Sequence, residues 1–468
     1  MPLIRSARSP GAKLAFAILV AGLLAIPLFA VYLLVYDRQS QSEKARGSIP
    51  QGWGGPQAIA GPLLVIPYDA QTTETVTVDN RQQTRTVTAR RELFLAPTTL
   101  QLTTAIAPER RQRSIYETVV YDAEVAGRGA YRIPPDLARL GIAPGALRPA
   151  EAELRFGIAD PRGLGTANRI IFDGRPVPAQ PGNGLRATGG AGFFAAVDAS
   201  ALAARPLPVD FRFAFRGHSS IRLDPRAGET IWRVTSAWPH PSFTGGFLPE
   251  QHRVSEAGFE AAWRISNLAL GTTLATTEDV QTSAAVEVAP AYPMGGGSVA
   301  AGGTQPVVNL IEPVDLYSQV NRSVKYGFLF IGFTFVAFLM FDIVGGVRVS
   351  AVEYLLVGAG LVLFFVLLLA FAEVMGFTPA YLLAAAAIVG LLTAYSAAVL
   401  ASRRRAGVVG GLLVGLYAVL YLLLSLEAYS LLIGSLLLFA ALAAVMFLTR
   451  RIDWSGERAA PAGAEPQG

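Results

Sequence analysis

The sequence predicts an integral membrane protein, in which an α-helical bundle of six spans carries a large mainly-β, sandwich-like domain inserted between spans 1 and 2. Apolar residues make up 52% of the chain and are concentrated in residues 1–36 and 326–454, as expected for membrane spans. The residues between these blocks carry most of the charge. They alternate repeatedly between apolar and polar side chains, which indicates strands.

Composition excludes several classes of function. The net charge of +5 is modest and lies partly at the edges of the apolar blocks, so it does not form the basic stripe that nucleic-acid binding needs. The chain has no cysteine, which excludes disulfides, thiol nucleophiles and thiolate metal sites. We therefore expect no nucleic-acid partner, and we expect no cofactor.

The first span is expected at residues 14–36, after the basic residues Arg5, Arg8 and Lys13. A cleaved signal has an apolar core of only about 7–15 residues and a small-residue cleavage site. The run here is longer and ends in "VYDRQS" without such a site. We expect a retained signal anchor, with Pro27 kinking the helix.

Five further spans follow in the C-terminal block. Each is close to the roughly 20 residues that cross a bilayer. They are expected at Val324–Val344, Tyr354–Ala372, Thr378–Leu400, Gly407–Leu426 and Tyr429–Leu448.

The charges of the short loops set the orientation. Strict alternation of six spans places all the strongly basic loops on one side, and the positive-inside rule assigns that side to the cytoplasm. These loops carry Arg5, Arg8, Lys13, Arg348, Arg403 to Arg405, Arg450 and Arg451, whereas the opposite turns carry Glu373 and Glu427. We therefore expect a cytoplasmic N-terminus (1–13), the anchor (14–36), a periplasmic domain (37–323), the five-span bundle (324–448) and a disordered cytoplasmic tail (449–468).

The large domain is expected to be mainly antiparallel β-structure. "TETVTVDN" and "TRTVTARRELFL" alternate around a polar turn, as a hairpin does. "YETVVYDAEV", "DFRFAFRG", "SSIRLDP" and "ETIWRVTSAW" show similar alternation, and no βαβ rhythm is present. The segment Ala291–Thr304, rich in glycine, is expected to be a flexible linker.

The segment "WPHPSFTGGFLPE" is the first candidate site. Its Pro239 and Pro241 limit strand pairing on either side of His240, and Gly245 allows a positive φ. The candidate recognition surface consists of Trp238, Pro239, His240, Pro241, Ser242 and Phe243, with Glu256 in the following "VSEAGFEAAW". The pattern favours a rigid, aromatic corner over a ligand site. "VSEAGFEAAW" either completes a strand pair or forms a short helix.

Enzyme and metal chemistry receive little support. The three histidines are His218, His240 and His252, and only a helix would bring His252 and Glu256 to one face. No HExxH or CxxC spacing is present, so no metal site is expected. "GHSS" at residues 217–220 lacks the second glycine of a nucleophile elbow. An envelope enzyme using His240 with Ser242 or Glu256 is kept as an alternative.

The predicted spans give two further hypotheses. Their interiors lack charged groups, which argues against ion-coupled transport, although a transporter or channel subunit is kept as an alternative. Gly407, Gly411 and Gly415 form a ladder that would let another helix approach closely. Packing within the bundle is favoured for this ladder, and homo-oligomer contact is the alternative.

Several separated segments resemble the CreD family of bacterial inner-membrane proteins. They are "GPLLVIPY", "DPRGLG", "WPHPSFTGGFLPEQHRVSEAGFEAAW", "VDLYSQVNRSVKYGFLFIGFTF", "YLLVGAGLVLFFVLLLAFAE" and "TRRIDW". The resemblance implies a cell-envelope integrity protein of the inner membrane, linked to envelope stress, colicin tolerance and β-lactam response under a two-component system. It implies no catalytic residues. The expected partners are the lipid bilayer and an envelope component, a partner protein or another copy of the chain.

Overall fold

The computed structural model describes residues 10–48, 53–78, 81–113, 116–135, 137–279, 305–310, 316–344, 351–399, 402–425 and 430–450. The chain divides into two compact units, Lys44–Pro313 and a helical unit of Met1–Glu43 with Val314–Gly468. Each unit is described by itself. The expected linker Ala291–Thr304, the basic residues Arg5, Arg8 and Arg348, and the tail after residue 450 lie outside the described residues.

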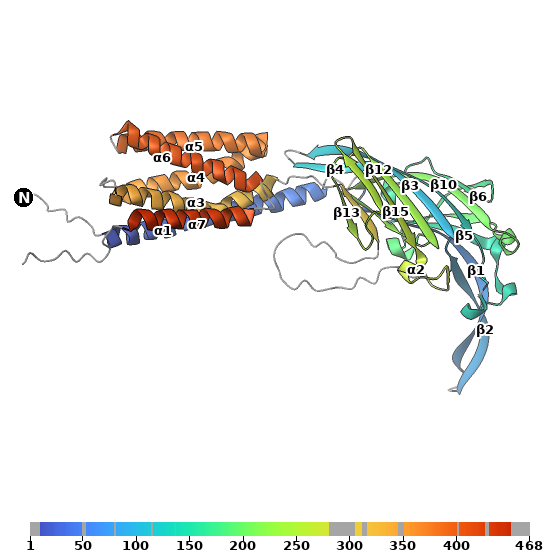
Figure 1. The fold of residues 1–468 in the computed structure, drawn as a ribbon. Helices are drawn as coiled ribbons and strands as arrows, with labels where there is room; N and C mark the ends of the chain where they lie inside the picture. The colour runs from blue at the N-terminus through green and yellow to red at the C-terminus, as the bar shows by residue number, and fades with distance from the viewer. Residues whose placement is uncertain are drawn as a thin grey trace, which may run out of the picture. The chain divides into compact units, whose positions relative to one another are not determined.

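The first unit is built from strands in two sheets (Figure 1). The nine-stranded sheet contains β1 (Gln57–Val78), β2 (Arg81–Leu95), β5 (Ala152–Ile158), β8 (Gln180–Pro181), β9 (Gly192–Val197), β11 (Ser220–Asp224), β13 (Pro241–Gly245), β16 (Ala275–Thr276) and β17 (Pro306–Leu310). The eight-stranded sheet contains β3 (Thr99–Arg113), β4 (Tyr116–Tyr131), β6 (Arg169–Phe172), β7 (Arg175–Val177), β10 (Leu207–His218), β12 (Glu229–Ser236), β14 (Gln251–Ser255) and β15 (Gly258–Ser266). The expected mainly-β domain of two sheets is confirmed.

The order of the strands in each sheet shows which strands are neighbours, which the sequence pattern does not reveal. The first sheet runs β13-β17-β11-β1-β5-β9-β8, with β2 beside β1 and β16 beside β2, and the second runs β14-β15-β12-β3-β4-β10-β6-β7. The expected hairpin forms between β1 and β2, with Val78 opposite Arg81. Two pairs are parallel, β1 with β11 and β3 with β12. They join segments far apart in the chain and are the two parallel exceptions among the described pairs of a domain that was expected to be mainly antiparallel.

Alternating side chains build the core between the sheets. β10 has the burial pattern expected from "DFRFAFRG": Phe211, Phe213 and Phe215 are buried, whereas Arg212 and Arg216 point to solvent. Phe156 of the other sheet packs edge-on against Phe211, with ring centroids 5.1 Å apart. Side chains of both sheets therefore fill one hydrophobic core.

Two buried tyrosines of β4 tie the sheets together by hydrogen bonds. The Tyr121 hydroxyl donates to the carbonyl of Ser220, at 2.7 Å, and the Tyr131 hydroxyl donates to the carbonyl of Pro62, at 3.0 Å. Both acceptors belong to the nine-stranded sheet, Ser220 on β11 and Pro62 on β1. Burial raises the pKa of both phenols, so they stay neutral and act as donors inside the core.

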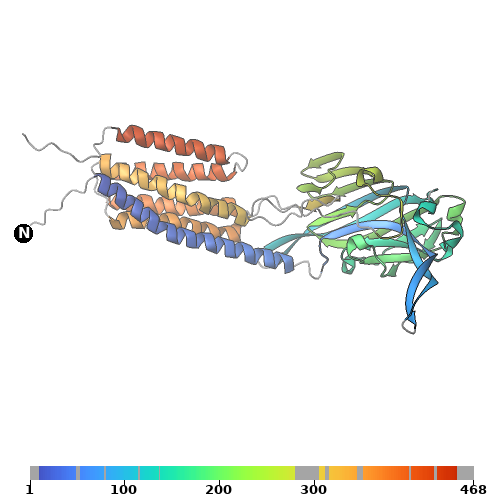
Figure 2. The ribbon, with the colours of Figure 1, turned by 90° about the horizontal axis from the view of Figure 1, so that it is seen from below.

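The second unit is helical (Figure 2). It contains α1 (Pro10–Ser48, most of which belongs to this unit), α3 (Leu316–Val344), α4 (Ala351–Met375), α5 (Phe377–Val399), α6 (Arg403–Ser425) and α7 (Ser430–Thr449), while the short α2 (Asn267–Leu270) belongs to the β unit. Among the described residues, four stretches are long and apolar enough to cross a membrane: Ile18–Lys44, Val352–Met375, Phe377–Ala398 and Ala406–Ser425. The chain therefore has one N-terminal and three C-terminal candidate membrane helices, and crossing by α3 and α7 is treated below as a proposal.

The first helix is longer than its expected apolar span. It continues for twelve residues beyond Tyr36, through a polar segment in which Gln41 donates to Asp37 one turn earlier, at 2.8 Å. Its buried face repeats every three or four residues, at Val20, Leu24, Leu28, Val31 and Val35. This face shows that α1 packs within the helical unit along its apolar length.

Gly410 makes the close helix contact in α6. A Cβ placed at Gly410 would lie 2.7 Å from Thr393 Oγ1 on α5. A Cβ at Gly407, Gly411 or Gly415 would meet no described atom within 4 Å. Of these four glycines, Gly410 is therefore the one that lies close to α5 within the described residues, and packing through the ladder stays a prediction.

Candidate functional site

The segment Trp238–Glu256 contains one edge strand of each sheet. β13 is the last strand of the nine-stranded sheet, and β14, which follows it in the chain, is the last strand of the eight-stranded sheet. The segment therefore crosses from one sheet to the other at their shared border. Its prolines match this place, because Pro241 begins β13 and lacks the N–H that an inner strand would need.

Aromatic side chains pack between β13 and β15, the strand that pairs with β14. Phe243 packs edge-on against Phe259 and Trp263, with ring centroids 5.7 Å apart in each case. Trp263 stacks on Trp232 at 4.8 Å and donates its indole N–H to the carbonyl of Phe247. These contacts make the segment a rigid aromatic corner.

Trp238 and Gly245 fix the path of the corner. Trp238 is 5% exposed and donates its indole N–H to the carbonyl of His240, at 3.1 Å. Gly245 has a φ of +95°, and a Cβ there would overlap the carbonyl of Gln305. Only glycine fits that position without moving β17.

The structure separates the polar residues that the sequence groups as candidates. The His240 side chain is exposed, and only its backbone carbonyl has a partner among the described hydrogen bonds. His252 lies on β14, and Glu256 is exposed in the turn before β15. "VSEAGFEAAW" thus completes a strand pair, so the alternative of a helix with His252 and Glu256 on one face is wrong. Among the described residues, no three His, Asp or Glu side chains are grouped to hold a metal.

His218 is the histidine with polar side-chain partners. Its Nε2 lies 2.9 Å from Thr118 Oγ1, and its Nδ1 lies 2.6 Å from Ser219 Oγ. Burial lowers the pKa of the imidazole, which favours the neutral ring. Ser219 has a φ of +55°, an uncommon value for serine. The "GHSS" pattern includes His218 and Ser219, but the contact with Thr118 depends on the pairing between β4 and β10.

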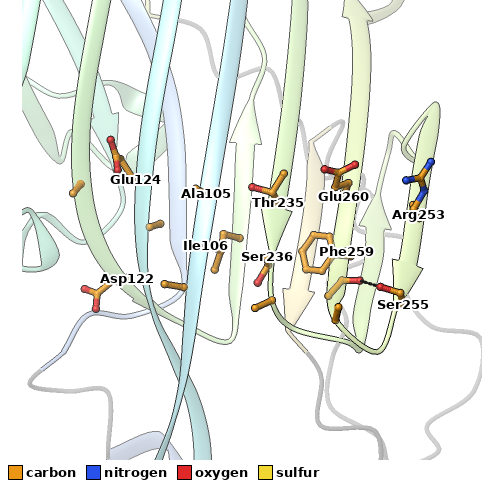
Figure 3. A pocket seen from close by; sticks show the side chains of 16 residues that line it. Ala105, Ile106, Asp122, Glu124, Thr235, Ser236, Arg253, Ser255, Phe259 and Glu260 are labelled. Atoms are coloured by element: carbon orange, nitrogen blue, oxygen red, sulfur yellow. Dashed lines mark hydrogen bonds between the residues drawn. The ribbon is translucent and has the colours of Figure 1, made fainter.

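A groove lies on the solvent face of the eight-stranded sheet, beside the aromatic corner (Figure 3). Strand register builds it, because one continuous row crosses six strands: Ala214, Glu124, Ala105, Thr235, Glu260 and Arg253. Directly paired residues point to the same face, so this row forms its floor. The groove measures about 760 Å³.

Small side chains make the hollow, and charged side chains surround it. The alanines of the lining are Ala105, Ala107, Ala123, Ala214, Ala237 and Ala257. Asp122 and Glu124 form ion pairs with Arg216, at 3.6 Å, and with Arg212, at 3.0 Å. All four charged side chains are more than 50% exposed, so these pairs contribute little to stability. The groove is suited to a broad, shallow contact.

Two comparisons with known proteins each match most of the chain. A sequence model of the family described as "Inner membrane protein CreD" matches residues 9–455. The chain belongs to the CreD family. It is also 31% identical to the inner membrane protein CreD of Escherichia coli (strain K12) over 440 residues, covering 92% of this chain and 91% of the relative.

Membership of the CreD family agrees with the two units. The family name and the four candidate membrane helices give a multi-pass inner-membrane protein, for which the lipid bilayer is the surroundings of the helices. Both the aromatic corner and the groove lie within the matched residues. The family match therefore includes the candidate site as well as the membrane helices.

Proposed function

We propose that this CreD-family chain maintains the cell envelope without catalysis, by holding an envelope component against the groove of its β unit. The observation that carries the proposal is the groove itself, which is lined by small side chains together with exposed charged ones. None of the three histidines lines it, and its hydroxyl groups come from Thr235, Ser236 and Ser255. Such a lining supports binding better than acid-base chemistry.

The proposal includes six spans and a periplasmic β unit. The support is the alternation of charge: α3 and α7 would complete six spans, and all the strongly basic loops would then face the cytoplasm. Reporter fusions after Ser200 and after Arg405 should report opposite compartments. The same compartment for both fusions would contradict this topology.

The binding role can be tested by filling the groove. Ala105→Arg places a long side chain on the groove floor, at an exposed position of β3. Thr103→Arg is the matched control, because Thr103 lies two residues away on the same face of the same strand and outside the groove lining. We expect Ala105→Arg, but not Thr103→Arg, to fail to restore envelope-stress or β-lactam tolerance to a deletion strain at equal protein level. Equal complementation by both variants would count against the groove.

One observation favours a hydrolytic enzyme as a second candidate. Ser219 Oγ lies within hydrogen-bond distance of His218 Nδ1, and Thr118 contacts the other ring nitrogen. The group that orients the imidazole is a threonine and not a carboxylate, which weakens the pair as a catalyst. Ser219→Gly suits the positive φ and removes the hydroxyl. If a stably expressed Ser219→Gly protein fails to restore tolerance to the deletion strain, the result supports the enzyme. Full complementation would exclude Ser219 as the nucleophile.

A further inference from the structure

One side of β13 has no strand partner among the described strands, and its pattern of free backbone groups follows from two hydrogen bonds. Gly246 N–H donates to the carbonyl of Gln305, and Leu310 N–H donates to the carbonyl of Ser219. In an antiparallel ladder, every second residue points its N–H and C=O at the same neighbour. Ser242 and Thr244 therefore face β17, whereas Pro241, Phe243 and Gly245 direct their backbone groups away from it.

We propose that two copies of the chain pair through β13, antiparallel and centred on Phe243. In this register the Phe243 N–H of each copy donates to the Phe243 carbonyl of the other. The Gly245 N–H of each copy donates to the Pro241 carbonyl of the other. All the free N–H groups of both strands are then used, because Pro241 has none. The missing donor of Pro241 falls opposite the Gly245 carbonyl, which is the one inter-strand acceptor that this register leaves without a donor.

Charge distinguishes β13 from the two edge strands of the eight-stranded sheet, β14 and β7. Its sequence, "PSFTG", carries no charged side chain, so two copies meet without repulsion. β14 has Arg253 at its centre, and antiparallel pairing of two β14 strands would place Arg253 against itself. At the other border of that sheet, β7 begins with Arg175. Unlike β14 and β7, β13 therefore lacks the charge that protects border strands from self-association.

Exposed apolar side chains lie beside the same border. Leu248 is 68% exposed and Val254 is 46% exposed. Val254 lies opposite Phe259, which packs edge-on against Phe243. A second copy at β13 would cover this apolar surface while it completes the hydrogen bonds. The pairing involves the border of the nine-stranded sheet and does not depend on a ligand in the groove.

The pairing register can be tested with cysteines, since the chain has none of its own. With Phe243 on the two-fold axis, Ser242 of one copy lies opposite Thr244 of the other, as a non-hydrogen-bonded pair with Cα atoms about 4.5 Å apart. That spacing is within the range of a disulfide, roughly 4.4–6.8 Å. Two differently tagged full-length chains, one with Ser242→Cys and one with Thr244→Cys, would be co-expressed and oxidised mildly in membranes.

We expect a disulfide-linked dimer when both variants are present, and its loss when either is expressed alone. Arg253→Cys chains, which carry the cysteine on β14, are the control for random collision. No link in the mixture, or a link with Ser242→Cys alone as strong as in the mixture, would overturn the proposal.

A charge-swap pair tests the same contact without cysteine. Ser242→Lys with Thr244→Lys places lysine opposite lysine at both positions, whereas Ser242→Lys with Thr244→Glu places lysine opposite glutamate. The two proteins lose the same Thr244 contact with Asn309. In light scattering of the full-length protein in detergent, we expect a monomer for the first and a dimer for the second and for the unmodified chain. The same mass for all three proteins would overturn the proposal.

Discussion

At the scale of single residues, Asp160 joins three parts of the β unit. Its carboxylate accepts hydrogen bonds from the Gly55 N–H, at 3.0 Å, and from the guanidinium of Arg162, at 2.7 Å. The Gln57 side chain bonds to the backbone of Asp160 and to the carbonyl of Arg216. The "DPRGLG" segment therefore holds the start of β1 against the end of β10. These contacts give the "DPRGLG" segment, one of those that resemble the CreD family, the structural role of joining β1 to β10.

Asp160→Ala should make the protein less stable in a way that depends on pH. The bond to Arg162 is the main cause that lowers the pKa of Asp160 from 3.8 to about 2. A lowered carboxylate pKa stabilises the fold above about pH 4, and this contribution is lost as the pH falls toward 2. We expect the variant to lose about 2 kcal/mol of unfolding free energy at pH 7.

Tryptophan fluorescence during urea unfolding of the detergent-solubilised chain would measure this difference at several pH values. The gap between the two proteins should narrow below about pH 4. A gap that stays constant down to about pH 2 would show that the carboxylate charge is not responsible.

Sequence reasoning anticipated the aromatic corner but could not name the hydrogen-bond partner of His218 on another strand. Prolines and aromatic residues in one short segment predict stiffness, and the structure has Trp238 and Phe243 packed there. The Thr118 hydroxyl that contacts the His218 ring lies one hundred residues earlier in the chain, on the neighbouring strand β4. No local pattern could have placed that hydroxyl beside the imidazole.

At the scale of elements, alternation predicted strands but not their neighbours. The patterns of β10 and of the β1–β2 hairpin are local, and both elements form as expected. The parallel pairing of β3 with β12 brings Ala105 beside Thr235, and it has no local signal. Because the groove floor is a row across six strands, it becomes visible only when the register of every pair is known.

Two adjacent glycines of α6 should respond differently to the same change. Gly410→Val would press into Thr393 of α5, and we expect it to cost about 1–3 kcal/mol through overpacking. Gly411→Val is the matched control, since a Cβ there meets no described atom within 4 Å. The midpoint of thermal unfolding in detergent should fall for Gly410→Val only. Equal shifts for both variants would place another helix against Gly411.

At the scale of the whole molecule, a β unit and a helical unit are joined by two chain crossings. The β unit begins near Lys44, close to the end of α1, and ends near Pro313, just before α3. Composition alone predicts a division at residues 37–323, because apolar runs and alternating runs occupy separate parts of the sequence. The proposed six spans also predict the side of the membrane on which each turn of the helical unit lies, and this prediction can be tested.

Cysteine labelling in intact cells should place the turn after α4 on the same side as the β unit. Leu268 and Val374 are 86% and 81% exposed, so Leu268→Cys and Val374→Cys should both react with a membrane-impermeant maleimide added from outside. Arg404→Cys should react only after the membrane is opened. The unmodified chain, which has no cysteine, gives the background. Protection of Val374→Cys in intact cells would refute the order of spans.

The position of β17 has a consequence for how the protein is made. β1, in the interior of the nine-stranded sheet, begins at Gln57, yet β13 finds its partner only in β17, which begins at Pro306. α3 begins at Leu316, a few residues later. During synthesis the sheet is therefore incomplete until just before the first C-terminal helix leaves the ribosome. Closure of this sheet and synthesis of α3 fall in the same short interval, and we expect pairing over so long a stretch of chain to slow folding.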